Sequence, residues 1–195
     1  MGCRVWVISL ALIFLSITPL VAGDLSTEHQ TLNLVCSNDD CSLSEDAVGD
    51  AMLIGEERDA NPLQPVTVSL EFPMSPDQTS VTLLPGFMES LIIDFRIQED
   101  GTGVTRPELN VELVLGPSTN SWTLSAPSAS PGNQNPYVLE NEELDITNGR
   151  ILAPLDEVLL RISFEINQPV TWELHLAGDS NIELPIEWSI DAQAA

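Results

Sequence analysis

Hydrophobic and polar residues alternate along much of the chain after residue 65. In the segment 66–72, V-T-V-S-L-E-F, every second residue is apolar and the residues between them are Thr, Ser and Glu. A period of two places alternate side chains on opposite faces of a β-strand. The same pattern predicts strands at 91–97, 109–115, 160–166, 172–176 and 182–190, and weaker strands at 80–84, 121–125 and 144–146.

Each clear strand has one apolar and one polar face, which is typical of antiparallel sheets packed face to face. The sequence therefore predicts an all-β fold, an antiparallel β-sandwich of about nine strands. Two strand orders remain open, a jelly-roll order, which we favour, and an immunoglobulin-like order. Pro185 falls inside the last strand and cannot donate a ladder hydrogen bond, so we expect an edge strand there.

Residues 1–23 have the order of a secretory signal peptide. A single Arg4 precedes an apolar stretch, 5–22, and the small residue Gly23 follows it. This order predicts export, with cleavage after Gly23 or Ala22. The stretch is also just long enough to cross a bilayer, so an uncleaved membrane anchor is the alternative. We expect a secreted or otherwise extracytoplasmic protein, free or attached to the cell surface.

Residues 24–65 form an acidic segment that differs in composition from the sandwich domain expected at 66–195. A short alternating run at 31–35 predicts one strand, and 46–54 is a weak candidate for a helical turn because glycines interrupt it. Two X-Pro pairs at 61–65 mark the boundary, because the residue before a proline favours extended conformations.

The acidic segment contains the two cysteines that remain after the signal, Cys36 and Cys41. An even number of cysteines in an oxidising compartment predicts a disulfide, here closing a small loop. A metal pair or a redox pair is the alternative, but those usually have the spacing C-x-x-C.

The chain carries 30 acidic residues against six basic ones, for a net charge of −24, and it contains no lysine. Such a surface repels the phosphates of nucleic acids and of anionic membranes. Cations, cationic proteins and neutral sugars remain as partners. Acidity without lysine favours a marine or halophilic source, although genomic base composition is another explanation for the missing lysine.

The sequence offers little for catalysis. Only two histidines occur, His29 in the acidic segment and His175 on the outward face of a strand, and no nucleophile or phosphate-binding motif is present. Among 30 acids, paired carboxylates arise by chance. We therefore expect no enzyme, with a carboxylate-dependent hydrolase as the less favoured alternative.

The sequence suggests two kinds of ligand-contacting residue, and it requires no cofactor. The first is a set of Ca²⁺ candidates in turns, because this ion prefers oxygen donors: Asp179, Asn181 and Asp156. The second is a pair of aromatics near the polar loop 128–135, Trp122 and Tyr137, the only aromatics that the pattern could place at a surface, although a position in the core is favoured for both. Trp172 and Trp188 share the apolar register of their strands and are expected in the core.

Together these features predict a secreted or cell-surface, non-catalytic β-sandwich module for binding or adhesion. Its partner would be a protein or a glycan, and neither a nucleic acid nor an anionic membrane surface. A structural component of the cell envelope or surface layer is the alternative function.

Overall fold

The computed structural model describes residues 29–37, 40–74, 81–83, 86–98, 106–127, 134–145, 150–152 and 158–188. The signal segment and Asp156 lie outside these ranges, and the side chain of Trp188 is not described either. The described chain is all-β. It contains no helix of the length and apolar character needed to cross a membrane.

Fourteen strands occur among the described residues. Their bounds are β1 (Gln30–Ser37), β2 (Asp40–Ser44), β3 (Met52–Glu57), β4 (Val66–Pro73), β5 (Val81–Leu83), β6 (Phe87–Gln98), β7 (Leu109–Leu115), β8 (Ser118–Leu124), β9 (Tyr137–Glu143), β10 (Arg150–Leu152), β11 (Val158–Ile166), β12 (Val170–His175), β13 (Asn181–Leu184) and β14 (Ile186–Trp188).

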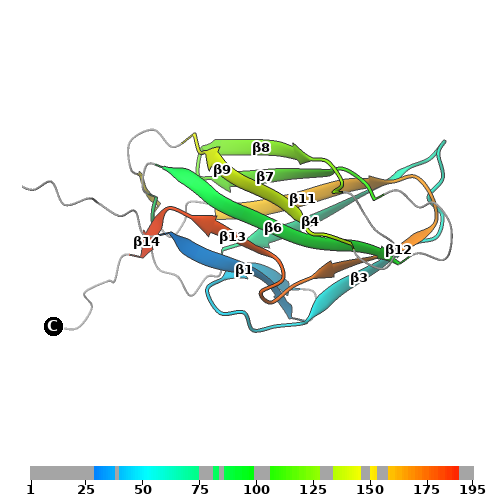
Figure 1. Cartoon of the computed structure of the whole chain (residues 1–195), viewed down its shortest axis with the longest axis horizontal. Coiled ribbons are helices and arrows are strands. Elements are labelled where there is room, and N and C mark those ends of the chain that lie inside the picture. The colour runs from blue at the N-terminus through cyan, green and yellow to red at the C-terminus, as the bar shows by residue number, and fades with distance from the viewer. Residues whose placement is uncertain are drawn as a thin grey trace, which may run out of the picture.

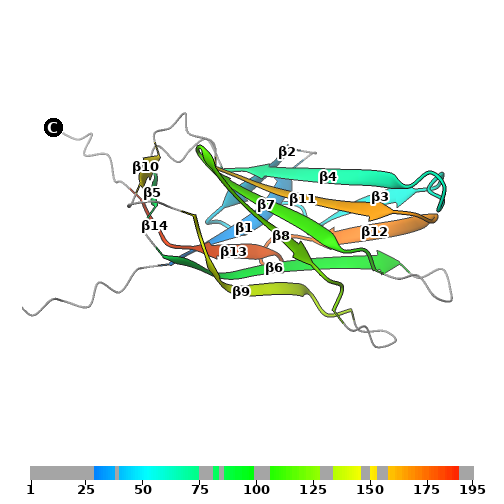
Figure 2. The same ribbon diagram turned by 90° about the horizontal axis from the view of Figure 1, so that it is seen from above.

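Two antiparallel sheets pack against each other, which confirms the predicted β-sandwich (Figures 1 and 2). The larger sheet has the order β2-β1-β13-β6-β12-β3, with β9 paired to β6 as well. The smaller sheet has the order β4-β11-β7-β8. A short third sheet, β10-β5-β14, lies at one end of the sandwich (Figure 2).

The strand order is that of a jelly roll. β12 and β13 follow one another along β6, where His175 pairs with Asp94 and Asn181 with Ile92. On their other side lie β3 and β1, also in succession. The first half of the chain then pairs with the second in nested fashion: β7 with β8, β6 with β9, β4 with β11, and β1 and β3 with β13 and β12. This nesting is the rolled hairpin of a jelly roll, the order that the sequence favoured.

The core lies between the two sheets and is tied together by an aromatic cluster. Phe95 on β6 and Trp172 on β12 stack with ring centroids 6.1 Å apart. Phe164 on β11 of the smaller sheet meets both rings, at 4.6 Å and 5.4 Å between centroids. Trp172 is only 6% exposed, as its apolar register predicted. The cluster therefore joins the two sheets.

The N-terminal segment contributes more to the sandwich than its composition suggested. β1 pairs with β13 inside the larger sheet, and Leu32 and Leu34 are fully buried. The weak helical turn expected at 46–54 is wrong, because part of this segment is β3, which pairs with β12. Pairing with an existing strand outweighs a helical tendency that the glycines already weaken. The sandwich thus begins well before Val66.

Pro185 separates two strands. β13, which precedes it, lies between β1 and β6 inside the larger sheet, whereas β14, which follows it, is an edge strand of the short third sheet, so the expected edge strand holds only for the residues after Pro185. The predicted strand 182–190 is instead divided at Pro185 into β13 and β14, which belong to different sheets. A residue without an N–H cannot continue the ladder, and here the chain changes sheets at that point.

Cys36 and Cys41 form the predicted disulfide. The two residues face each other across the β1–β2 hairpin, with their Cα atoms 4.0 Å apart. Closing so short a loop removes little entropy from the unfolded chain, about 2 kcal/mol on the loop-length model. The disulfide therefore fixes the hairpin more than it stabilises the whole sandwich.

The close approach of β3 to Trp172 yields a test of the core. A Cβ atom added at Gly55 would lie 2.1 Å from Cζ2 of the buried Trp172 ring, so Gly55→Ala would force this ring away from Phe95 and Phe164. We expect the free energy of unfolding to fall by about 1 to 3 kcal/mol, the usual cost of overpacking. Chemical denaturation of the variant measures this change.

The control is Gly86→Ala, where the added Cβ would have Pro185 as its nearest neighbour at 3.5 Å, an ordinary contact. Its unfolding free energy should stay close to that of the parent chain. Equal losses in the two variants would contradict a specific role for the space at Gly55.

Candidate functional site

The outer face of the larger sheet brings polar side chains of three neighbouring strands into register. β12 lies between β6 and β3, and Trp172 and Leu174 of β12 point into the core. The residues between them therefore point outward. The resulting rows across β3, β12 and β6 are Met52–His175–Asp94, Ile54–Glu173–Arg96 and Glu56–Thr171–Gln98.

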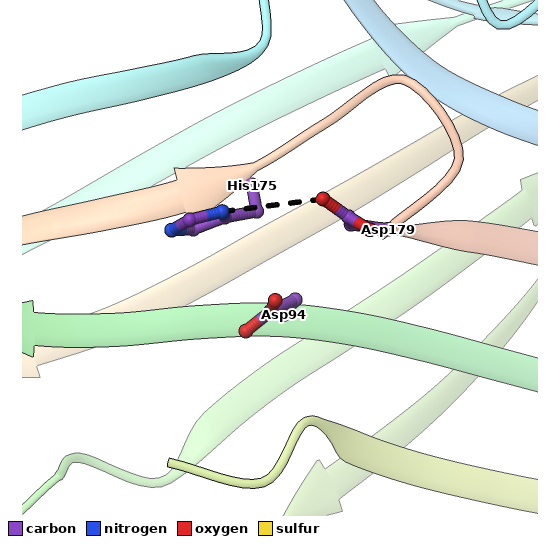
Figure 3. Close-up of side chains that lie close together, drawn as sticks. All are labelled: Asp94, His175 and Asp179. Atoms are coloured by element: carbon purple, nitrogen blue, oxygen red, sulfur yellow. Dashed lines mark ion pairs between the residues drawn. The ribbon is translucent and has the colours of Figure 1, made fainter. Parts of the chain in front are cut away.

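His175 lies among three carboxylates. Its Nε2 is 3.3 Å from Oε2 of Glu173, and its Nδ1 is 4.0 Å from Oδ2 of Asp179. Asp94, His175 and Asp179 each offer one ligand atom that lies within 4.8 Å of the other two. Figure 3 shows the three side chains, with Asp94 on the strand beside His175 and Asp179 on the turn that leaves β12. Among the described residues, these are the three side chains that lie close enough together to hold one metal ion.

Burial differs sharply within the cluster. The side chains of Asp94 and His175 are 10% and 14% exposed, whereas that of Asp179 is 65% exposed. Asp94 and His175 are thus held within the surface of the sheet, whereas Asp179 lies in the exposed turn at its border.

The two carboxylates nearest the strands have fixed partners. Arg96 donates from Nε to Oδ1 of Asp94 at 2.9 Å and from Nη2 to Oδ2 at 2.6 Å. These hydrogen bonds are the main reason that the pKa of Arg96 is raised. Gln98 donates from Nε2 to Oε1 of Glu173. Both carboxylates are therefore oriented by residues of β6.

The turn between β12 and β13 places Asp179. Ala177 and Gly178 both have positive φ, 51° and 109°, and this backbone shape suits glycine at the second position. Ser180 is fully buried, and its hydroxyl accepts a hydrogen bond from the N–H of Asp94 at 2.9 Å while donating to the carbonyl of His175 at 2.6 Å. One hydroxyl thus ties the turn to both strands of the cluster.

The structure brings one of the three Ca²⁺ candidates to this cluster. Asp179 lies beside His175, while Asn181 lies on β13 and donates from Nδ2 to the carbonyl of Gly178 at 3.2 Å, as a turn-forming residue does. Asp156 is outside the described residues. Calcium binding at these three residues therefore stays a prediction.

Sequence reasoning placed Asp94, Arg96, Glu173 and His175 on outward faces but did not bring them together. The alternating pattern predicts which face of the sheet each residue lies on. It does not predict which residues of β6 and β12 are paired. The cross-strand pair His175–Asp94 therefore became visible only with the fold.

Tyr137 lies in the core, the position favoured for it, so the ligand-facing alternative is wrong for this residue. Its side chain is 1% exposed, its hydroxyl donates to the carbonyl of Pro107 at 2.6 Å, and the guanidinium of Arg106 lies 4.4 Å from its ring centroid. Trp122 faces the buried side of the smaller sheet opposite Val111, where it is half-buried against the core. Apolar packing decided both positions, despite the polar loop nearby.

Comparison of the chain with protein-family models, with curated proteins and with solved structures found no match.

Tyr137 provides a pH test, because it is the only tyrosine of the chain. Burial raises its pKa from 10.0 to about 12. Near-ultraviolet absorbance should therefore show tyrosinate forming about two pH units later in the native protein than after denaturation.

The same shift has a consequence for stability. Between pH 10 and about 12 the unfolded chain loses this proton while the folded chain keeps it. Stability present below pH 10 is therefore lost as the pH rises through this window, by up to about 3 kcal/mol. Tyr137→Phe should be less sensitive to pH in the same range, and an ordinary tyrosine titration in the native protein would contradict the buried position.

Proposed function

We propose that the protein is an extracytoplasmic, non-catalytic β-sandwich module that binds a cationic partner through the outer face of its larger sheet. The observation that carries this proposal is the excess of carboxylates on that face after its arginines have been paired. The disulfide Cys36–Cys41 and the expected signal segment support a place outside the cytoplasm.

Every arginine whose side chain the structure describes is already engaged. Arg58 pairs with Glu56 at 2.6 Å and Arg96 pairs with Asp94. Arg161 binds Glu71 and Glu112 on the smaller sheet. Arg106 is 7% exposed and donates to the carbonyls of Asn135 and Phe95. These cations are therefore committed to contacts within the fold.

The larger sheet keeps outward carboxylates that form no ion pair with an arginine among the described residues: Glu140, Glu173, Asp179 and Glu183. The smaller sheet carries fewer such groups, because Arg161 binds both Glu71 and Glu112 and the row Ser69–Ser163–Asn110–Thr123 has no charge, which leaves Glu165 as its carboxylate without an arginine partner among the described residues. The two outer faces thus differ in character, and the larger sheet is the one that attracts a cation.

A charged face of this kind favours the encounter with an oppositely charged partner and discriminates against anionic ones. It offers little support for a nucleophilic mechanism. The hydroxyl of Ser180 beside His175 is buried and bonded on both sides, and Nε2 of His175 faces a carboxylate. Binding is therefore the function that this arrangement supports best.

The test uses two double variants that each remove two negative charges. Glu140→Gln with Glu183→Gln changes the larger sheet, and Glu108→Gln with Glu165→Gln is the matched change on and beside the smaller sheet. The probe is a fluorescent oligo-arginine peptide, with affinity measured by anisotropy at several NaCl concentrations.

We expect the larger-sheet variant to bind about two- to thirtyfold more weakly than the matched control, because each of the two surface charges contributes about 0.2 to 1 kcal/mol. Affinity of the parent chain should fall steeply as NaCl shortens the screening length. Equal weakening in both variants would show that only the overall charge matters, and the proposed face would be abandoned.

A further inference from the structure

We propose that Asp94, His175 and Asp179 form a binding site for one divalent transition-metal ion of the zinc class. The site is carried by the geometry around His175. It does not depend on the cationic partner proposed above, because the metal would contact only side chains of this chain.

The first argument is the hydrogen-bonding capacity of the imidazole. A neutral histidine has one N–H donor and one nitrogen lone pair. With the proton on Nε2, the ring donates to Glu173 at 3.3 Å, and the lone pair is on Nδ1, which lies 4.0 Å from Oδ2 of Asp179. Asp94 offers a further oxygen within 4.8 Å of a ring nitrogen of His175 and of Asp179. One nitrogen lone pair and two carboxylates thus lie close together, and a metal ion can accept an electron pair from each of them.

The second argument is the arrangement behind the imidazole. Metal-binding histidines usually donate their other ring N–H to a carboxylate, which fixes the tautomer and makes the ligand more basic. Glu173 occupies this position, and Gln98 holds the opposite oxygen of Glu173. Glu173 is therefore a positioning residue for the proposed site.

Asp94 can bind a metal while it keeps Arg96. A carboxylate offers about four lone-pair sites, and the two hydrogen bonds from Arg96 use one on each oxygen. Hydrogen-bonded carboxylates are common ligands, since the bonds hold them in position. Arg96 also offsets part of the negative charge before the ion arrives.

Asp179 completes the site from the turn. Donors around a tetrahedral zinc ion lie about 3.4 Å apart, since each is about 2.0 to 2.2 Å from the metal. The donor atoms here lie within 4.8 Å of one another, so binding would draw them together by at most about 1.4 Å. The side chain of Asp179 is 65% exposed and can move toward Nδ1 of His175, which is 4.0 Å away, by changing its rotamer.

The donor set distinguishes between metals. Ca²⁺ takes six to eight oxygen ligands, and Mg²⁺ prefers carboxylates and water. An imidazole nitrogen combined with two carboxylates suits Zn²⁺ and neighbouring first-row ions. The Ca²⁺ expectation for Asp179 is thereby replaced by a transition metal at the same residue.

The experiment is a calorimetric titration of the purified full chain with ZnCl₂ and, separately, with CaCl₂ at matched ionic strength. The variants are His175→Gln, Asp179→Asn and Glu173→Gln. The matched control is His29→Gln, which changes the only other histidine of the chain, itself 3.4 Å from the carboxylate of Glu89. Thermal unfolding in the presence of a chelator verifies that each variant is folded.

We expect one Zn²⁺ per chain, bound at least about tenfold more tightly than Ca²⁺. His175→Gln and Asp179→Asn should weaken zinc binding by at least tenfold, and Glu173→Gln by about 10- to 100-fold. His29→Gln should leave the affinity unchanged. Co²⁺ added in place of Zn²⁺ should give a visible absorption spectrum that His175→Gln abolishes.

Two results would overturn the proposal. One is zinc binding no tighter than calcium binding, which would show diffuse attraction to the acidic surface. The other is a folded His175→Gln variant with the affinity of the parent chain, which would place any bound zinc elsewhere.

Discussion

The antiparallel pairing of β6 with β12 and β13 is the constraint on which the rest of the structure depends. β6 is the longest strand described, and β9 pairs with the first part of it while β12 and β13 follow one another along its length. The same register sets both sides of the sheet. On the inner side it stacks Phe95 on Trp172, and on the outer side it aligns Asp94 with His175. A shift by one residue would move both groups to the wrong face.

The period-two pattern predicts most of the strands and their buried faces. It does not predict the register in which neighbouring strands pair. Val111, Leu113 and their neighbours on β7 alternate so regularly that the strand and its buried face were predictable. β9 was missed, since its sequence Y-V-L-E-N-E-E is mostly acidic in its second half and its strand is interrupted by Asn141, which has a φ of 57°. The edge strand expected around Pro185 is found only in β14, because the proline also ends β13. Local sequence indicates which face of the sheet a residue lies on. The residue with which it pairs on the neighbouring strand depends on contacts between distant segments of the chain.

The candidate site shows the same division. The outward positions of Glu173 and His175 were predictable, and so was the turn that contains Asp179. The contribution of Asp94 was not, because no sequence spacing relates β6 to β12. The burial of Asp94 was not predictable either. Among the described residues, it is one of the few charged residues with less than a tenth of their surface exposed, and its ion pair with Arg96 offsets the cost of burying the carboxylate. Tyr137 is the opposite case, an aromatic beside a polar loop that packs inward.

The engagement of the arginines also bears on how the protein would survive outside a cell. Trypsin-like proteases cleave after Lys or Arg, and this chain has six such positions, all of them arginine. One of these, Arg106, is followed by Pro107, and cleavage before proline is unfavourable. Arg161 lies in β11, which is paired there with β4 on one side and β7 on the other, and Arg96 lies in β6, which is paired there with β12. A protease needs an extended, unpaired segment, so cleavage at these two strands must wait until the sandwich opens. Arg58 differs, because its side chain is 78% exposed just beyond the end of β3. Among the described arginines it is therefore the position that a protease would reach first in the folded protein.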